Sequence, residues 1–337
     1  MTIYICIEAV LLVLLFKKKP HHIGYSLISI GLLLISAFRA ESVGTDVVNY
    51  IIEYNLHGIE TWKESFTNSE YTFAIYCKFL NVLGLKERGF LIATAILFAM
   101  LLMIALHVNH CDKILTFSLF YFAGLYLQSF CIIRQSLAIV TALISYSSLE
   151  KNYSIQMPYN KGRFQRFPIG FVIGMIIAIG FHPTVIVLFA LPVMMLFYGQ
   201  KRCRKPSVFL RDGILCMSAA LIILPVLYPF ILQHSKEKYQ VLYGGSYVTG
   251  PFGNWKSGIL LVALYLIFYI AYYNNWKKLT EKENIIVGSV IMLAFACSSL
   301  SIINSTLGRT NLFFEGLMVL MPVSYTHLRA HETLSDL

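Results

Sequence analysis

Charged residues are scarce in this chain of 337 residues: Asp, Glu, Lys and Arg make up 13% of it, about half the share of a soluble domain. Apolar and aromatic residues make up 57%, and the mean hydropathy is +0.68. This composition indicates a protein embedded in lipid and excludes a nucleic-acid-binding protein, although the net charge is +10. At about 20 residues per span, the length accommodates roughly ten transmembrane helices and leaves little for a soluble domain.

Motifs that hold metals or cofactors are also missing. The seven cysteines are scattered without a CxxC pair, and the chain has no Gly-rich phosphate loop, no metal-spaced His or Cys cluster and no GxSxG elbow. We therefore expect no metal and no cofactor, and cysteines that pack within apolar segments. Without a nucleotide-binding domain, an activated substrate is expected to arrive on a lipid.

The apolar runs predict an all-α fold: a polytopic integral membrane protein with about 10–11 transmembrane helices in a single multi-pass domain over residues 1–322. The runs are Thr2–Phe16, Ile23–Phe38, Phe90–Leu106, Ile114–Phe130, Gln135–Leu149, Pro168–Phe181, Thr184–Tyr198, Gly213–Leu232, Gly258–Tyr273, Ile285–Ile303 and Asn311 onward.

The segment Tyr71–Leu85 decides the topology, because it is apolar but short and carries Lys78. If it does not span, the basic clusters face the cytoplasm, as the positive-inside rule requires; if it spans, the two richest clusters face outward. We therefore predict that this segment is interfacial or re-entrant and that the N-terminus lies outside. The basic clusters are Lys17–Lys19, Lys113, Lys151–Arg166, Lys201–Arg211 and Lys277–Lys282.

This topology places two long loops outside, residues 39–70 and 233–257. The first is acidic and aromatic, and the second mixes aromatic residues with glycine and proline. Such loops suit sugar rings, and they equally fit an aromatic belt at the membrane interface.

The C-terminal tail, residues 323–337, is a polar string that breaks the last apolar run. It resembles translated sequencing-adapter read-through, so we expect it to be non-native and the last native span to be truncated. His327 and His331 are four residues apart within it, and for this reason we do not take them as a metal site.

Four polar residues fall near the outer membrane boundary: Arg39, Arg134, His182 and Arg309. Guanidinium groups match phosphate oxygens in bidentate geometry, so they could bind a lipid-linked pyrophosphate and stabilise the charge that develops when it departs. Asp46 or His182 could act as the base, and the sequence does not choose between them. Arg39 and Arg309 could instead anchor helix ends, and His182 could cap a helical hairpin.

At these residues the chain resembles the EpsG family of bacterial exopolysaccharide proteins, which are akin to Wzy-type polysaccharide polymerases. The resemblance implies a multi-pass protein of the bacterial inner membrane that joins lipid-linked oligosaccharide repeat units at the outer face. The matching segments are Arg39–Asp46 with Asn49 and Tyr50, Ile133–Ala138, Phe181–Thr184 and Gly308–Asn311.

The resemblance also implies a set of roles. Arg134, His182, Arg309 and Asp46 are the expected catalytic residues, and Arg39, Gln135, Asn49 and Tyr50 are the expected substrate-binding residues. Arg134 and Arg309 would hold pyrophosphates, Arg39 and Asp46 would order the first outer loop, and His182 would orient or deprotonate the acceptor. The expected partners are undecaprenyl-pyrophosphate-linked oligosaccharide, membrane lipid, and a chain-length regulator and a flippase of the same pathway.

Two other functions stay open. A membrane O-acyltransferase that modifies glycans would depend on an acyl donor and release no pyrophosphate. A flippase or exporter of lipid-linked sugars would favour internal repeats and broken helices near the midplane.

Overall fold

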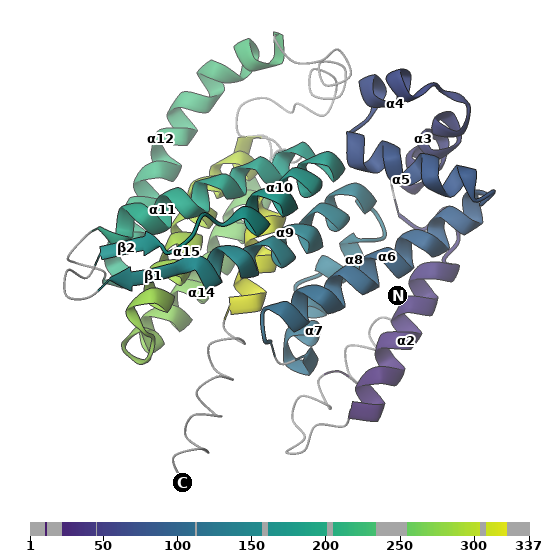
Figure 1. The fold of residues 1–337 in the computed structure, drawn as a ribbon. Helices are drawn as coiled ribbons and strands as arrows, with labels where there is room; N and C mark the ends of the chain where they lie inside the picture. Colours follow the sequence, from purple (N-terminus) through teal and green to yellow (C-terminus); the bar gives the residue numbers. More distant parts are fainter. Residues whose placement is uncertain are drawn as a thin grey trace. The chain divides into compact units, whose positions relative to one another are not determined.

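The protein is described from a computed structural model (Figure 1). The structure describes residue 11 and residues 22–44, 46–111, 113–156, 161–200, 205–233, 255–303 and 308–321. The predictions for Thr2–Phe16, for most of the loop 233–257 and for the tail 323–337 therefore lie outside the described residues. The chain divides into two compact units, one comprising residues 1–151, 168–186 and 319–337, and the other residues 152–167 and 187–318.

The first unit is built from helices. They are α2 (His22–Phe38), α3 (Val47–Ile59), α4 (Trp62–Asn68), α5 (Tyr71–Val82), α6 (Glu87–Val108), α7 (Lys113–Phe122), α8 (Leu125–Gln128), almost all of α9 (Ile133–Asn152) and α10 (Ile169–Phe181). The prediction of one continuous helix over Ile114–Phe130 is wrong. Gly124 adopts a left-handed conformation with φ of +76°, which ends α7 and starts the short α8.

Helix α9 is buried on nearly all sides, although it carries many polar residues. The hydroxyl of Thr141 donates to the Leu137 carbonyl, and that of Ser145 donates to the Thr141 carbonyl, so these groups are satisfied within the helix. Helix α10 approaches α9 through glycine: a Cβ on Gly174 would lie 2.0 Å from Ser145 Oγ. Small residues at such contacts let helices pack closely, as is typical of membrane proteins.

The other side of α10 contacts α5. The Tyr71 hydroxyl donates to the Ile176 carbonyl at 2.5 Å, and the Thr72 hydroxyl donates to the Ile177 carbonyl at 3.1 Å. A Cβ on Gly180 would lie 2.0 Å from Thr72 Oγ1, so this contact also requires glycine. Helix α10 therefore links the α5 segment to the buried α9.

The second unit contains a small antiparallel hairpin as well as helices. Its elements are β1 (Tyr153–Gln156), β2 (Lys161–Phe164), the end of η1 (Pro183–Phe189), α11 (Ala190–Gly199), α12 (Pro206–Gln233), α14 (Trp255–Asn275), η2 (Trp276–Lys278) and α15 (Glu281–Ile303), followed by most of an apolar helix over Asn311–Met321. Helix α15 packs against both α12 and α14. The all-α prediction missed the hairpin, in which Tyr153 pairs with Phe164 and Gln156 with Lys161.

Four helices in the described part of the chain are long and apolar enough to cross a membrane: Glu87–Val108, Pro206–Leu224, Gly258–Lys278 and Glu281–Ile302. Shorter apolar helices cover Leu27–Phe38, Ile169–Phe181, Pro183–Gly199 and Asn311–Met321. The protein is thus mostly helical, as expected for an all-α membrane protein. The number of spans and their orientation stay predictions.

Candidate functional site

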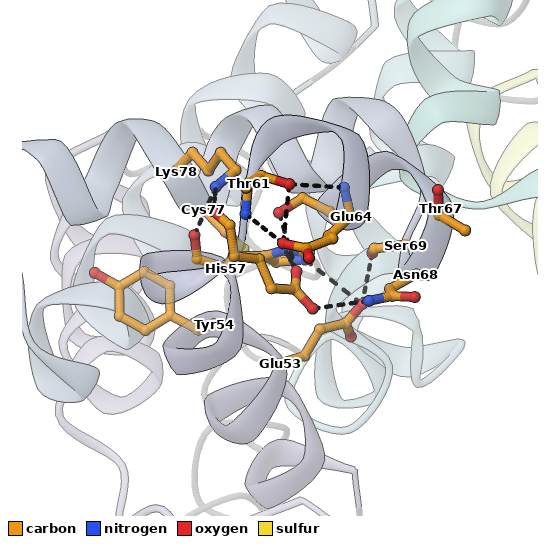
Figure 2. A network of polar contacts seen from close by, with 12 residues as sticks. Glu53, Tyr54, His57, Thr61, Glu64, Thr67, Asn68, Ser69, Cys77 and Lys78 are labelled. Atoms are coloured by element: carbon orange, nitrogen blue, oxygen red, sulfur yellow. Dashed lines mark hydrogen bonds and ion pairs between the residues drawn. The ribbon is translucent and has the colours of Figure 1, made fainter.

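The predicted first outer loop is mostly helical, because α3 and α4 lie within residues 39–70. We call α3, α4 and α5 with their connections the α3–α5 segment. Helix α4 begins with a capping box: Glu64 N–H donates to Thr61 Oγ1 at 3.3 Å, and Thr61 N–H donates to Glu64 Oε2 at 2.7 Å (Figure 2). On α3, the Tyr54 ring stacks on Phe90 of α6 with centroids 4.7 Å apart.

Helix α5 covers most of the apolar segment Tyr71–Leu85. It has 12 residues and is therefore about 18 Å long, well short of the roughly 30 Å of a bilayer core. Helix α5 is accordingly not one of the four helices of spanning length, and its interfacial or re-entrant position stays a prediction.

Arg134 lies at the centre of the polar contacts of the first unit. It is the second residue of α9, and its Nη1 donates to Glu53 Oε1 at 3.2 Å and to Glu70 Oε2. Its side chain is 21% exposed, against 24% for Glu53 and 11% for Glu70. Two carboxylates on one guanidinium nitrogen fix the position of this cation.

Two aromatic rings support the same guanidinium. The Arg134 Cζ lies 5.5 Å from the ring centroid of Tyr50 and 5.5 Å from that of Phe73. The two rings pack edge to face, with centroids 6.1 Å apart, and both are buried. Cation–π contacts of this kind stabilise the Arg134 guanidinium in addition to its two ion pairs.

A second network continues from Glu53 along α3. His57 is 1% exposed; its Nδ1 lies 3.1 Å from Glu60 Oε2, and its Nε2 lies 3.9 Å from Glu53 Oε1. Glu60 accepts from Asn68 Nδ2 at 2.8 Å and from Ser65 Oγ at 3.0 Å. Burial opposes the ionisation of Glu60, but the hydrogen bonds from Asn68 and Ser65 and the neighbouring His57 outweigh it and lower the pKa of Glu60 below its usual value.

Lys78 joins α5 to the end of α3. Its Nζ donates to the carbonyl of His57 at 2.9 Å and to that of Glu60 at 2.6 Å, and it lies 5.2 Å from the Trp62 ring centroid. These carbonyls are the free acceptors of the last turn of α3, so a cation is favourable there. Lys78 therefore has a structural role that the apolar surroundings of its sequence did not suggest.

The Arg39–Asp46 stretch packs against the chain that leads into α9. Gly44 has φ of +109°, and a Cβ there would lie 2.3 Å from the Phe130 carbonyl oxygen. Asp46 stands at the N-terminus of α3, where its carbonyl accepts from Tyr50 N–H at 3.1 Å. Asn49 is exposed, whereas Gln135 is buried beside Arg134 in the sequence. The structure thus brings the predicted residues Asp46, Tyr50, Arg134 and Gln135 into one part of the first unit.

The Arg39 side chain is positioned by contacts with Ser36 and Phe130. Its Nη1 donates to the Ser36 carbonyl at 3.0 Å and to Ser36 Oγ at 3.2 Å, and its Cζ lies 5.1 Å from the Phe130 ring centroid. A cavity of about 10 Å³ beside it is lined by Ser36, Ser129 and Ser136, among others. That is space for one water molecule and not for a phosphate. This geometry fits the predicted loop-ordering role of Arg39 better than substrate contact.

His182 follows α10 and is half-buried, with its Nδ1 2.7 Å from Thr184 Oγ1. Gly180, two residues earlier, packs on Thr72, two residues after Glu70. The His182 end of α10 therefore lies near the beginning of α5, on the side of Glu70.

Arg309 belongs to the second unit and is exposed. Its neighbour Asn311 is buried: it accepts from the Tyr265 hydroxyl at 3.1 Å, and its Nδ2 donates to Ser301 Oγ and to the Gly308 carbonyl, both at 3.0 Å. These bonds fix the turn that presents Arg309.

The sequence analysis did not select Glu53, His57, Glu60 and Glu70 as site residues. The signal was present as Glu-x3-His-x2-Glu at residues 53, 57 and 60, which places the three side chains on one face of a helix. It was missed because residues 39–70 were taken as a loop. Among the described residues, no three His, Cys, Asp or Glu side chains are grouped so as to hold a metal ion.

These features define a helical membrane protein whose first unit gathers an arginine, three glutamates and a histidine around the α3–α5 segment. The chain belongs to the EpsG family, whose family model matches residues 22–333. The match includes residues 323–333 of the tail that the sequence analysis set aside.

Membership of this family implies a polymerase function related to exopolysaccharides and supports a glycosyltransferase-type enzyme in a membrane. Comparison with curated proteins and with solved structures gave no match.

Proposed function

We propose that this protein polymerises oligosaccharide repeat units carried on undecaprenyl pyrophosphate, at the outer face of the bacterial inner membrane. Membership of the EpsG family supports a polymerase reaction, and the cluster of charges around Arg134 supports a site for that reaction. The α3–α5 segment that supplies Glu53 and Glu70 lies on the outer side in the predicted topology, together with Arg134. In the same pathway, a flippase would supply the repeat units and a chain-length regulator would act on the product.

The reaction needs stabilisation of a leaving group and removal of a proton. When the anomeric carbon leaves one lipid carrier, negative charge builds on the departing pyrophosphate, and a fixed cation stabilises this charge more than it stabilises the ground state. The acceptor hydroxyl must also give up its proton as its oxygen bonds to the anomeric carbon. Polar side chains can meet both needs.

Arg134 suits the first need. A guanidinium has five donors in a planar fork, and the two carboxylates take donors of Nη1 alone. A phosphate oxygen that reaches another donor of the fork meets a cation already held by Glu53, Glu70 and two aromatic rings. Such preorganisation is what lowers the cost of charge development.

The other expected residues are given roles that agree with their surroundings, and for Arg39, Tyr50 and Gln135 a supporting role replaces the expected contact with substrate. Arg309, exposed at a fixed turn of the second unit, would hold a pyrophosphate, and Asn49, exposed on α3, would contact sugar hydroxyls. Arg39 and Asp46 would order the chain before α3. Tyr50 and Gln135, both buried, would support Arg134 and its helix.

The test is to delete the gene in a host that carries the surrounding glycan genes, and to analyse lipid-linked sugars and surface polymer together. Single repeat units on lipid at the outer face, with polymer absent, are expected. Repeat units trapped at the inner face would replace the proposal with transport, and polymer of normal length without an acyl group would replace it with O-acylation.

Complementation with point variants sharpens this test. Arg134→Lys keeps the charge but loses the planar fork, so polymer is expected to fall at least about 100-fold, nearly as far as with Arg134→Ala. Arg211→Lys is the matched control, because Arg211 also pairs with a carboxylate, Asp212, but is 64% exposed in the second unit. Near-normal polymer from Arg134→Lys would contradict the role given to Arg134.

A further inference from the structure

Glu53 is the residue at which the two polar networks of the α3–α5 segment meet. Its Oε1 accepts from Ser69 Oγ at 2.5 Å and faces His57 Nε2 at 3.9 Å (Figure 2). The same oxygen accepts from Arg134 Nη1 at 3.2 Å. All three contacts fall on the same oxygen. The Glu53 side chain is 24% exposed, so it is within reach of a hydroxyl from outside.

His57 is placed to take a proton from Glu53. Glu60 stays ionised and accepts hydrogen bonds, so His57 Nδ1 is the protonated nitrogen facing it at 3.1 Å. Nε2 is then an acceptor; it is buried, has no hydrogen-bond partner, and is directed at Glu53. A buried polar atom without a partner costs free energy, so a purely structural network would be expected to satisfy it.

The His57 ring lies between two carboxylates, those of Glu53 and Glu60. The polar groups near Glu53 and His57 come from several elements: Glu60 after α3, Asn68 at the end of α4, Ser69 after it, Glu70 before α5, Cys77 and Lys78 on α5, and Arg134 on α9. Lys78 donates to backbone carbonyls, whereas the ring nitrogens of His57 face Glu53 and Glu60.

We propose that Glu53 is the catalytic base that accepts the proton of the acceptor sugar hydroxyl, with His57 and Glu60 as the relay that takes it onward. This inference rests on the proposed function. The acceptor oxygen bonds to the anomeric carbon of the donor glycan while the bond from that carbon to the pyrophosphate oxygen breaks. The electron pair leaves with the pyrophosphate, beside Arg134. The proton passes to the Glu53 oxygen that does not hold Ser69 and Arg134, and rotation of the carboxyl group then brings this oxygen to His57 Nε2, which takes the proton.

This proposal assigns the role of catalytic base to Glu53, whereas the sequence left that role open between Asp46 and His182. Asp46 starts α3 and its backbone carbonyl caps the first turn, whereas His182 contacts Thr184. Glu53 combines a partly exposed side chain, a fixed cation at 3.2 Å and a buried nitrogen of His57 at 3.9 Å. Proton transfer to His57 requires the separation of 3.9 Å to shorten to hydrogen-bond length, about 3 Å, as catalytic contacts do when substrate binds.

The experiment uses the full chain in proteoliposomes, with a polyprenyl-pyrophosphate-linked repeat unit as the probe and the rate of chain growth as the readout. Glu53→Gln keeps the volume and the hydrogen bonds but cannot take the proton. We expect kcat to fall at least about 100-fold, with KM for the repeat unit within about threefold of the wild type. Glu64→Gln is the matched control, because Glu64 lies on the same segment but serves only the capping box.

The pH profile separates catalysis from structure. The limb of the pH profile of kcat that belongs to the catalytic base should be present in the wild type and absent in Glu53→Gln. His57→Gln should lower kcat about 10-fold and move the limb, whereas a structural role would change kcat equally at every pH.

The outcomes separate the two proposals. If the wild type makes no polymer, the proposed function fails; if the wild type makes polymer and Glu53→Gln matches its kcat, only the assignment of the base fails. If Glu53→Gln does not fold, Glu60→Gln decides, because it removes the relay and leaves every contact of Arg134 in place. An unchanged pH profile in Glu60→Gln would overturn the relay.

Discussion

Replacement of Arg134 by methionine is expected to destabilise the first unit, because it leaves Glu53 and Glu70 side by side without their shared cation. Removing one partner of a fully buried ion pair costs about 3–5 kcal/mol. The three side chains are 11–24% exposed, which reduces this cost, and the lost contacts with Tyr50 and Phe73 add about 0.5–1 kcal/mol each. We expect a loss of about 3 kcal/mol in the free energy of unfolding.

A double-mutant cycle tests this reasoning. In the wild-type background Glu70→Gln should destabilise by about 1–2 kcal/mol, because it weakens the contact with Arg134. In the Arg134→Met background the same change should stabilise by about 1 kcal/mol, because it removes repulsion between two carboxylates. The sign of the effect of Glu70→Gln therefore reverses between the two backgrounds.

The measurement is reversible denaturant unfolding in mixed micelles, followed by the fluorescence of Trp62 in the α3–α5 segment. Arg211→Met is the control, because its exposed ion pair with Asp212 should contribute little. If Glu70→Gln destabilised both backgrounds equally, the coupling through Arg134 would be refuted.

Three further predictions concern the same unit. Gly44→Ala should destabilise by about 2–3 kcal/mol, because its Cβ would lie 2.3 Å from a carbonyl oxygen at φ of +109°, whereas Gly31→Ala, with nothing within 4 Å, should not; thermal unfolding of both variants compares them. The pKa of Glu60 is lowered in the folded state, so Glu60 stabilises the fold above its ordinary pKa of 4.5, and this stabilisation is lost as the pH falls through the folded pKa. When the pH is lowered from 7 to 3, the unfolding midpoint should therefore drop less in Glu60→Gln than in the wild type. Single cysteines at Thr67 and Lys86, both exposed, should react with an impermeant reagent from the same side in a chain cleared of native cysteines, and labelling from opposite sides would make α5 a span.

The long helices could be predicted from the sequence, because hydropathy reports directly on burial in lipid. The run Phe90–Leu106 became α6, Pro168–Phe181 became α10, and Ile285–Ile303 became α15, each within a few residues. The break at Gly124 could not be predicted in this way, because a left-handed residue changes the path of the chain without changing its hydropathy. The β-hairpin in the basic loop was missed for a similar reason, since its strands have only four residues each.

The candidate site was predicted in part. Arg134 stood out because a guanidinium among apolar residues is costly, and the structure shows how this charge is balanced. Its partners could not be predicted, because Glu53 and Glu70 lie 81 and 64 residues away in the chain and meet it only through the packing of the α3–α5 segment. The position of Arg39 over a ring, beside a cavity that fits only a water molecule, likewise depends on tertiary structure.

The most direct test of the central claim gives the purified chain, in proteoliposomes, a single polyprenyl-pyrophosphate-linked repeat unit. The products are then resolved by mass. The account predicts a ladder of glycans that differ by one repeat unit, with one free polyprenyl pyrophosphate released for each new bond, and no ladder from Arg134→Lys. Repeat units that cross the bilayer without being joined, or that gain an acyl group without releasing pyrophosphate, would contradict it.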